Sequence, residues 1–130
     1  PIHDSLAELL PPNKLSHYQE CGAIEVAPLA YMRGRTLKRA FIILDEAQNT
    51  TIAQMKMFLT RLGPASKAII TGDATQIDLA KKEPSGFLHA MQLLKGIKGI
   101  SQIDFQAEDV LRHRLVKEII AAYSDKGERI

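Results

Sequence analysis

The 130-residue sequence has one cysteine, no tryptophan and no long hydrophobic run. Cys21 alone cannot form an internal disulfide, which favours a reduced, cytoplasmic setting over secretion. The longest apolar runs, 40–44 and 119–123, fall far short of the roughly 20 residues that span a bilayer. The N-terminus also lacks the basic-then-apolar pattern of a signal peptide. We therefore expect no membrane association.

Neither charge sign is in large excess. Seventeen Lys and Arg against 15 Asp and Glu give a formal net charge of +2, so the bulk charge indicates no particular partner, although a local basic patch remains compatible with it. A hydrophobic fraction of 45% excludes a disordered or collagen-like chain. The length fits a single domain over residues 1–130. The first residue is Pro rather than Met, which we interpret as a fragment or a processed product.

A phosphate-binding loop of the form G-x-x-x-x-G-K-[ST] is also missing. No glycine is followed by another glycine five residues later. The histidines and Cys21 do not have the spacing of a zinc site, and no G-x-S-x-G nucleophile motif occurs. These absences exclude zinc and serine-nucleophile sites, and they exclude a complete P-loop nucleotide site within this chain.

The apolar pattern predicts strands that alternate with helices. Two solid apolar runs predict buried strands, and shorter alternating stretches predict two more, so the predicted strands are 24–27, 41–44, 67–71 and 100–105. Three- and four-residue apolar spacing predicts the helices 4–10, 51–62, 85–94 and 109–123, and residues 13–22 are predicted to be a polar link with weak helical character. This order is typical of an α/β, three-layer fold with a mostly parallel sheet.

The ends of the 51–62 helix carry specific signals. Thr51 followed by Gln54 predicts a capping box at its start. Gly63 and Pro64 predict a left-handed cap and a stop at its end.

Polar clusters follow both solid apolar runs. Asp45 to Asn49 follows the first and Gly72 to Gln76 follows the second, and Asp45 and Asp73 are 28 residues apart. One strand-helix-strand unit places both clusters at the same sheet edge, where such sheets bind ligands. Each cluster taken alone is better explained as a loop start with a helix cap or as an ordinary turn, and it is the pair of clusters that favours a ligand site.

The residue types in these clusters suit phosphoryl transfer. Asp45 would hold Mg²⁺ through its water shell, and Glu46 would orient and polarise an attacking water. Gly72 permits a close backbone approach to a ligand. Gln76 carries donor and acceptor groups that suit a sensor of the terminal phosphate.

Cations are concentrated in two other stretches. Residues 33–39 hold Arg33, Arg35 and two further cations, without a carboxylate between Glu25 and Asp45. This stretch suits the phosphates of a nucleotide or of a nucleic-acid backbone, or an arginine that acts across a subunit interface; a solvated basic loop is the alternative. In the last predicted helix, Arg112 is a second candidate for a nucleotide phosphate.

Taken together and in order, these motifs resemble the PhoH family of ATPases. The resemblance rests on PIHDSL (1–6), EVAPLAYMRGRTL (25–37), FIILDEAQNTT (41–51), QMKMFLTRLG (54–63), TGDATQIDL (71–79) and DVLRHRLV (109–116), and it covers nearly the whole chain. It implies a RecA-like P-loop fold without its N-terminal Walker A unit, so that residues 1–130 form the C-terminal portion of a PhoH-like ATPase domain.

The resemblance also implies roles and ligands. Asp45 and Glu46 become the Walker B pair, and Asp73 and Gln76 belong to the third helicase-like motif. The implied ligands are ATP and Mg²⁺, and the implied cellular role is in RNA metabolism. The implied nucleotide-binding residues are Thr71, Gly72, Asp73, Arg33, Arg35 and Arg112, and the catalytic residues are Glu46, Asp45 and Gln76.

We therefore expect part of an Mg-dependent ATPase, inactive as this chain alone and active when joined to a Walker A loop. The partners are ATP and RNA, and a homo-oligomer is compatible with arginines that act across an interface. The alternatives are a truncated, non-catalytic module that binds RNA or protein, and a relic fragment without independent activity.

Overall fold

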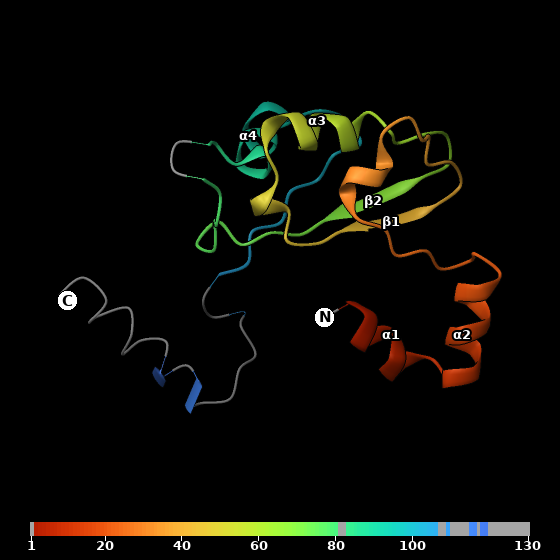
Figure 1. The fold of residues 1–130 in the computed structure, drawn as a ribbon. Coiled ribbons are helices and arrows are strands. Elements are labelled where there is room, and N and C mark those ends of the chain that lie inside the picture. Colours follow the sequence, from red (N-terminus) through yellow and green to blue (C-terminus); the bar gives the residue numbers. More distant parts are fainter. Residues whose placement is uncertain (1, 81–82, 107–108, 110–114, 117, 120–130) are drawn as a thin grey trace. The chain divides into compact units, whose positions relative to one another are not determined.

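The computed structural model describes residues 2–80, 83–106, 109, 115–116 and 118–119. The chain divides into two units, residues 1–93 and 94–130, which are taken separately below. The interpretation of residues 1–130 as one domain stays a prediction. In chain order the elements are α1 (Ile2–Leu9), α2 (Pro12–Glu20), the 3₁₀ helix η1 (Leu29–Met32), β1 (Phe41–Leu44), the 3₁₀ helix η2 (Ala47–Asn49), α3 (Ile52–Leu59), β2 (Lys67–Ile70) and α4 (Gly86–Leu93) (Figure 1).

β1 and β2 form a parallel pair joined by α3. Phe41 lies opposite Lys67 and Leu44 lies opposite Ile70. The predicted α/β class with parallel strands is therefore confirmed for this pair, and the two strands lie side by side beneath α3 and α4 (Figure 1).

The expected three-layer arrangement is not confirmed, and the strands are not buried on both faces. Phe41 is 62% exposed, Ile43 46% and Ile69 42%. These side chains alternate with Ile42, Leu44 and their partners in β2, which are half-buried. The physical reason is that α3 and α4 cover one face of the pair, and no described element covers the other.

α3 forms where the sequence predicts it, with the predicted N-terminal cap. The Thr51 hydroxyl accepts from the Gln54 amide at 3.2 Å, and the Gln54 side chain accepts from the Thr51 amide at 2.9 Å. Met55 and Phe58, each 2% exposed, provide the core beneath the helix. This reciprocal cap satisfies two amides that a helix start otherwise leaves unpaired.

The end of α3 differs from the prediction. The helix stops at Leu59 with Thr60 as its C-cap, and Gly63 does not adopt a left-handed conformation. Gly63 is required for space instead, because a Cβ there would lie 2.9 Å from the carbonyl oxygen of Leu37. The Gly63 amide donates to that same oxygen at 2.8 Å, so the backbones approach too closely for a side chain.

The structure differs from two predictions near the N-terminus. The segment 13–22, predicted as a polar link with weak helical character, belongs largely to helix α2, which Pro12 starts from the first turn, where its missing amide costs nothing. The strand expected at 24–27 has no ladder partner among the described residues and is irregular. The short alternating pattern there had no neighbouring strand to pair with.

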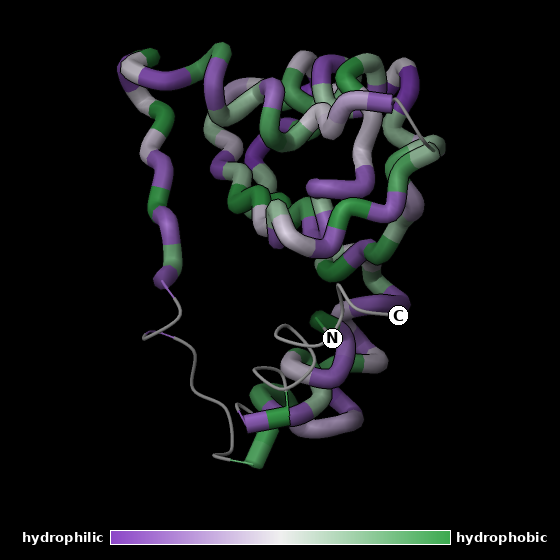
Figure 2. Tube along the Cα trace, turned by 90° about the vertical axis from the view of Figure 1, so that its left-hand side faces the viewer, coloured by the Kyte–Doolittle hydropathy of each residue, from purple (hydrophilic) through white to green (hydrophobic). Residues whose placement is uncertain are grey.

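The second unit also differs from the prediction. Residues 100–105 alternate in hydropathy (Figure 2) but form no strand. Ile103 is 78% exposed and Phe105 82%, and no strand in the part of the chain that the structure describes pairs with this segment. Of the predicted helix 109–123, only residues 115–116 and 118–119 are described as α-helical, and most of it lies outside the described residues.

Candidate functional site

The two polar loops meet at the carboxyl ends of β1 and β2, as the sequence predicts. The Thr71 amide donates to the Leu44 carbonyl at 2.9 Å, and the Ala47 amide donates to the Thr71 carbonyl at 2.9 Å. The strand pairing thus continues one step beyond each strand. This step fixes the start of both loops relative to each other.

Asp45 is held at the mouth of this junction. Its Oδ1 accepts from the Thr71 hydroxyl at 2.7 Å and from the Glu46 amide at 3.1 Å. Its side chain is half-buried, and its Oδ2 accepts no bond from the described part of the chain. One carboxylate oxygen is therefore oriented by protein donors while the other is available to a ligand or to water.

Glu46 sits at a sharp backbone turn. Its φ of 53° and ψ of 35° place it in the left-handed region, which is uncommon for residues other than glycine. The turn redirects the chain directly after Asp45, so that the next amide reaches the Thr71 carbonyl. The Glu46 residue is exposed, and one carboxylate oxygen accepts from the Gln48 side-chain amide at 2.6 Å.

Gln48 is the main functional residue that the sequence reasoning missed. It is 0% exposed, and its side chain connects the two loops. Its Nε2 donates to Glu46 at 2.6 Å and to the Gln76 carbonyl at 3.4 Å, and its Oε1 accepts from the Asp73 amide at 3.1 Å. The only sequence signal was a long amide side chain two residues after a strand-end carboxylate.

The backbone around Gln48 is anchored by α4. The Gln48 carbonyl accepts from the Ser85 hydroxyl at 2.8 Å. A Cβ on Gly72 would lie 3.0 Å from the Phe87 ring and 3.1 Å from the backbone nitrogen of Gln48. Gly72 was expected to allow a ligand to approach the backbone. In the structure it allows the second loop to pack closely on α4 and on the first loop.

The loop after β2 is ordered mainly by Asp73. Its Oδ1 accepts from the Thr75 amide at 2.8 Å and from the Thr75 hydroxyl at 2.6 Å. Its Oδ2 accepts from the Gln76 side-chain amide at 2.6 Å. The Gln76 carbonyl thus lies within reach of the Gln48 side chain, and the Gln76 NH₂ group is bonded to Asp73. A role for Gln76 at a phosphate stays a prediction.

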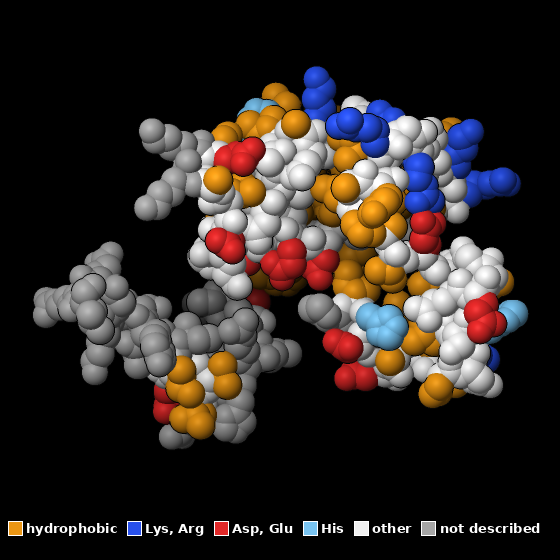
Figure 3. Space-filling model, in the orientation of Figure 1, with side chains coloured by type: hydrophobic (Ala, Val, Ile, Leu, Met, Phe, Trp, Pro, Cys, Tyr) orange, Lys and Arg blue, Asp and Glu red, His pale blue; other side chains and the backbone are white. Residues whose placement is uncertain are grey.

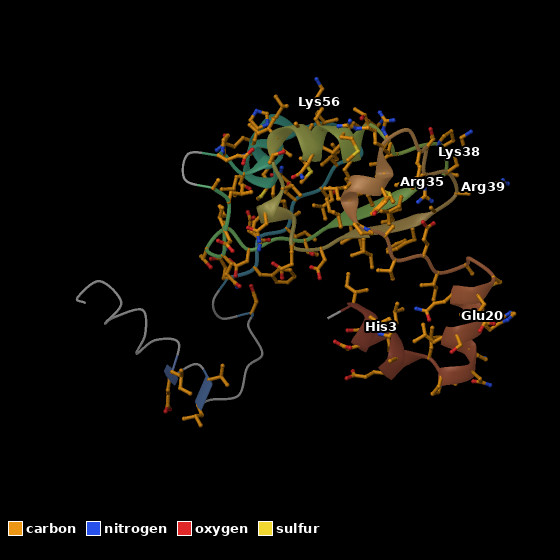
Figure 4. All side chains as sticks on the ribbon, viewed as in Figure 1. His3, Glu20, Arg35, Lys38, Arg39 and Lys56 are labelled. Atoms are coloured by element: carbon orange, nitrogen blue, oxygen red, sulfur yellow. The ribbon has the colours of Figure 1, made fainter. Side chains whose placement is uncertain are left out.

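The structure does not bring Arg35 to these loops. Arg35 forms a two-pronged ion pair with Glu25, with N–O distances of 2.6 and 2.8 Å. It lies near the amino ends of the strands (Figure 4), whereas Asp45 follows the carboxyl end of β1. Arg33 is the C-cap of η1, two residues before Arg35. Arg112 lies outside the described residues.

The Glu25–Arg35 pair affects the titration of both groups. The Arg35 guanidinium lowers the pKa of Glu25, first through hydrogen bonding and then through charge attraction. Glu25 raises the pKa of Arg35 by the same two effects. Because both side chains are about half exposed, the pair fixes the local chain geometry more than it stabilises the fold.

The described residues contain no group of three or more His, Cys, Asp or Glu side chains that could hold a metal ion. A magnesium ion that binds one carboxylate, water and substrate phosphates does not need such a group. None of the described helices combines the length and apolar character that a membrane crossing requires.

Comparisons with known proteins agree over most of the chain. The family model for PhoH-like protein matches residues 1–124. The PhoH-like protein of Bacillus subtilis is 59% identical over 127 residues, which are 98% of this chain and 40% of that protein. The PhoH-like protein of Mycobacterium tuberculosis H37Rv is 54% identical over 124 residues, 95% of this chain and 35% of that protein. Protein PhoH of Escherichia coli K12 is 43% identical over 126 residues, 95% of this chain and 36% of that protein. The chain thus spans 35–40% of the length of these relatives.

Proposed function

We propose that this chain, which belongs to the PhoH-like protein family, supplies the metal-holding and water-orienting half of an Mg-ATP hydrolase site. The proposal concerns the longer protein, because the chain covers at most 40% of the relatives compared above. The chain itself has no G-x-x-x-x-G-K-[ST] loop. The phosphate cradle would have to come from another part of the protein.

The observation that carries the proposal is the connection between the two strand-end loops. Asp45 accepts from the Thr71 hydroxyl, and Gln48 joins Glu46 to the loop of Asp73 and Gln76. Two unrelated turns would not need a fully buried amide between them. A hydrolase site does need an acid pair and a phosphate-facing loop held in fixed relation, since misplacement by about 1 Å can cost about 100-fold in rate.

The donor set fits magnesium. Mg²⁺ keeps several waters and takes one or two carboxylates together with substrate phosphates. Asp45 offers one oxygen that is oriented by Thr71 and one that accepts no protein bond among the described residues. When bound, the ion would neutralise charge on the transferred phosphate. Asp45 would hold its water shell, and the exposed Glu46 would orient and polarise the attacking water.

The test uses a chimera in which this chain replaces the matching segment of the Bacillus subtilis relative. Glu46→Gln keeps the size of the side chain and removes its charge. We expect ATP binding within about twofold of the parent chimera and turnover at least about 100-fold lower, since general-base assistance contributes about 100- to 10,000-fold. Glu20→Gln, which makes the same change in α2, is the control and should leave both quantities unchanged.

Two outcomes would contradict the proposal. If the Glu46→Gln chimera hydrolyses ATP at the rate of its parent, Glu46 does not orient or polarise the attacking water. If the parent chimera neither binds nor hydrolyses Mg-ATP while remaining folded, the chain is better described as the non-catalytic RNA- or protein-binding module. Calorimetric titration with Mg-ATP measures binding, and phosphate release measures turnover.

RNA is proposed as the second partner. The support is the family resemblance together with the cations of residues 33–39. An arginine acting across a homo-oligomer interface is also proposed, since Arg35 is paired with Glu25 near the amino ends of the strands (Figure 4), whereas Asp45 and Glu46 follow the carboxyl end of β1. Both proposals concern the longer protein.

A further inference from the structure

The charges of the first unit are segregated along the sequence. Residues 26–44 and 47–72 contain seven Lys and Arg but no Asp or Glu. The only acids between residues 26 and 72 are Asp45 and Glu46, which lie at the carboxyl end of β1. The small net charge of the whole chain therefore conceals a strongly basic region.

The fold gathers several of these cations at the amino ends of the strands. Lys38 and Arg39 precede β1, and Lys67 begins β2. Lys56, on α3, points away from that helix and stands apart from them (Figure 4). Lys38, Arg39 and Lys67 are exposed, and none forms an ion pair with another described residue. We call these three residues the basic edge (Figures 3 and 4).

Backbone hydrogen bonds hold the basic edge in one shape. The Arg39 amide donates to the Pro64 carbonyl at 3.0 Å, and the Lys67 amide donates to the Ala40 carbonyl at 3.0 Å. The Ser66 hydroxyl donates to the Leu37 carbonyl at 2.7 Å. The cations thus belong to two segments that hydrogen bonds hold together. Less conformational entropy is therefore lost when they bind a polyanion than if the segments were free to move.

An exposed aromatic side chain lies on the element that precedes this region. Tyr31 in η1 is 72% exposed, and η1 ends six residues before Lys38. Exposed aromatics beside a cationic track are typical of surfaces that bind single strands, because every base has a face that can stack. A site for a small anion does not require an exposed aromatic.

We propose that the basic edge binds the phosphate backbone of a single-stranded nucleic acid, with Tyr31 as a stacking platform. This inference assigns a surface to the RNA partner of the proposed function, and it does not depend on ATP hydrolysis. Arg33 and Arg35 were predicted for nucleotide phosphates. The neighbouring cations at the basic edge lie at the amino ends of β1 and β2, whereas Asp45 follows the carboxyl end of β1. A nucleic acid bound at the basic edge therefore leaves the loops proposed for the nucleotide free.

The test measures binding of fluorescent 12-nucleotide strands to the chimera without nucleotide, over a range of salt concentrations. The variant is K38Q/R39N, in which Asn tolerates the left-handed φ of 48° at position 39. K95Q/K98N removes two charges from exposed positions in the second unit and is the matched control. Circular dichroism melts show that each variant is folded.

The expected change follows from counterion release. Each phosphate contact to a single strand contributes about 0.7 to the slope of log affinity against log salt, so two lost contacts lower that slope by about 1.4. At 0.1 M salt this corresponds to about 25-fold weaker binding. Tyr31→Ala should weaken binding about fivefold or more without changing the salt slope. K95Q/K98N should match the parent.

Several outcomes would overturn the inference. The first is that the parent chimera binds neither RNA nor DNA strands. The second is that K38Q/R39N shows the same slope of log affinity against log salt as the parent. The third is that the chimera binds only duplexes. If polyglutamate of equal charge displaces the fluorescent strand as well as an unlabelled strand does, the surface is a site for acidic protein instead. Binding of RNA alone, or of RNA and DNA alike, supports it. A parent chimera that binds Mg-ATP but neither RNA nor DNA strands would refute this inference and leave the hydrolase proposal standing.

Discussion

Replacing Gln48 by Met tests whether the buried amide holds the two loops together. Met has a similar length and volume, so the change removes the polar group without opening a large cavity. It deletes two donated bonds, to Glu46 at 2.6 Å and to the Gln76 carbonyl at 3.4 Å, and one accepted from the Asp73 amide at 3.1 Å. The three bonds do not contribute equally.

The size of the effect can be worked from each former partner. Glu46 is exposed, so water replaces its lost donor at little cost. The bond to Gln76 is long and therefore weak. The part-buried bond from the Asp73 amide to Gln48 is lost, which costs about 1–3 kcal/mol. We therefore expect Gln48→Met to lower the free energy of unfolding by about 1–3 kcal/mol.

The assay combines urea unfolding of the chimera with hydrogen exchange of the peptide covering residues 71–78. Local release of the loop speeds exchange there even where global stability changes little. Gln92→Met, at an exposed position in α4, is the control. If Gln48→Met leaves both the unfolding free energy and the exchange of 71–78 at parent values, the amide does not connect the loops and the reasoning fails.

Two further predictions concern packing and titration. Gly86→Ala should destabilise the chimera by about 2 kcal/mol or more in urea unfolding, because the new Cβ would lie 2.2 Å from the Thr51 carbonyl oxygen; His89→Ala on the same helix should have little effect, and equal stability of the two variants would contradict the packing. Glu25 should titrate below its ordinary pKa of 4.5 in a carboxyl NMR titration, because Arg35 favours its charged form. The contribution of this lowered pKa to stability is present above pH 4.5 and is lost as the pH falls through the folded value. Arg35→Gln should return the pKa of Glu25 toward 4.5, and no difference between parent and variant would contradict the ion pair.

The local elements were largely predictable from the sequence. The strand at 41–44, the capping box at Thr51 and the helix after it follow from apolar periodicity and local hydrogen bonding, and each appears where expected. The meeting of the two loops was also predictable, because one strand-helix-strand unit places both strand ends at one edge. These features depend on neighbours in the sequence or on a single parallel connection.

Features that depend on more distant packing were not predictable. The alternation at residues 100–105 suits a strand, but a strand requires a partner, and no described strand pairs with this segment. Gly63 was read as a helix cap, whereas the contact that requires a glycine is with Leu37. Gln48 looked like one more loop residue, because its burial depends on Ser85 and α4, almost forty positions further along.

The basic stretch illustrates why sequence proximity misleads at a strand. Arg35 lies only ten residues before Asp45, which made it a natural candidate for the same phosphates. β1 lies between them, however, and a four-residue strand extends about 13 Å. The ion pair with Glu25 further holds Arg35 near the amino ends of the strands. Arg35 therefore cannot reach Asp45 of the same chain unless that ion pair breaks. An arginine for the proposed transition state must therefore come from elsewhere in the protein or from a neighbouring subunit. Mixing Arg35→Gln and Glu46→Gln chimeras would recover turnover only in the subunit case.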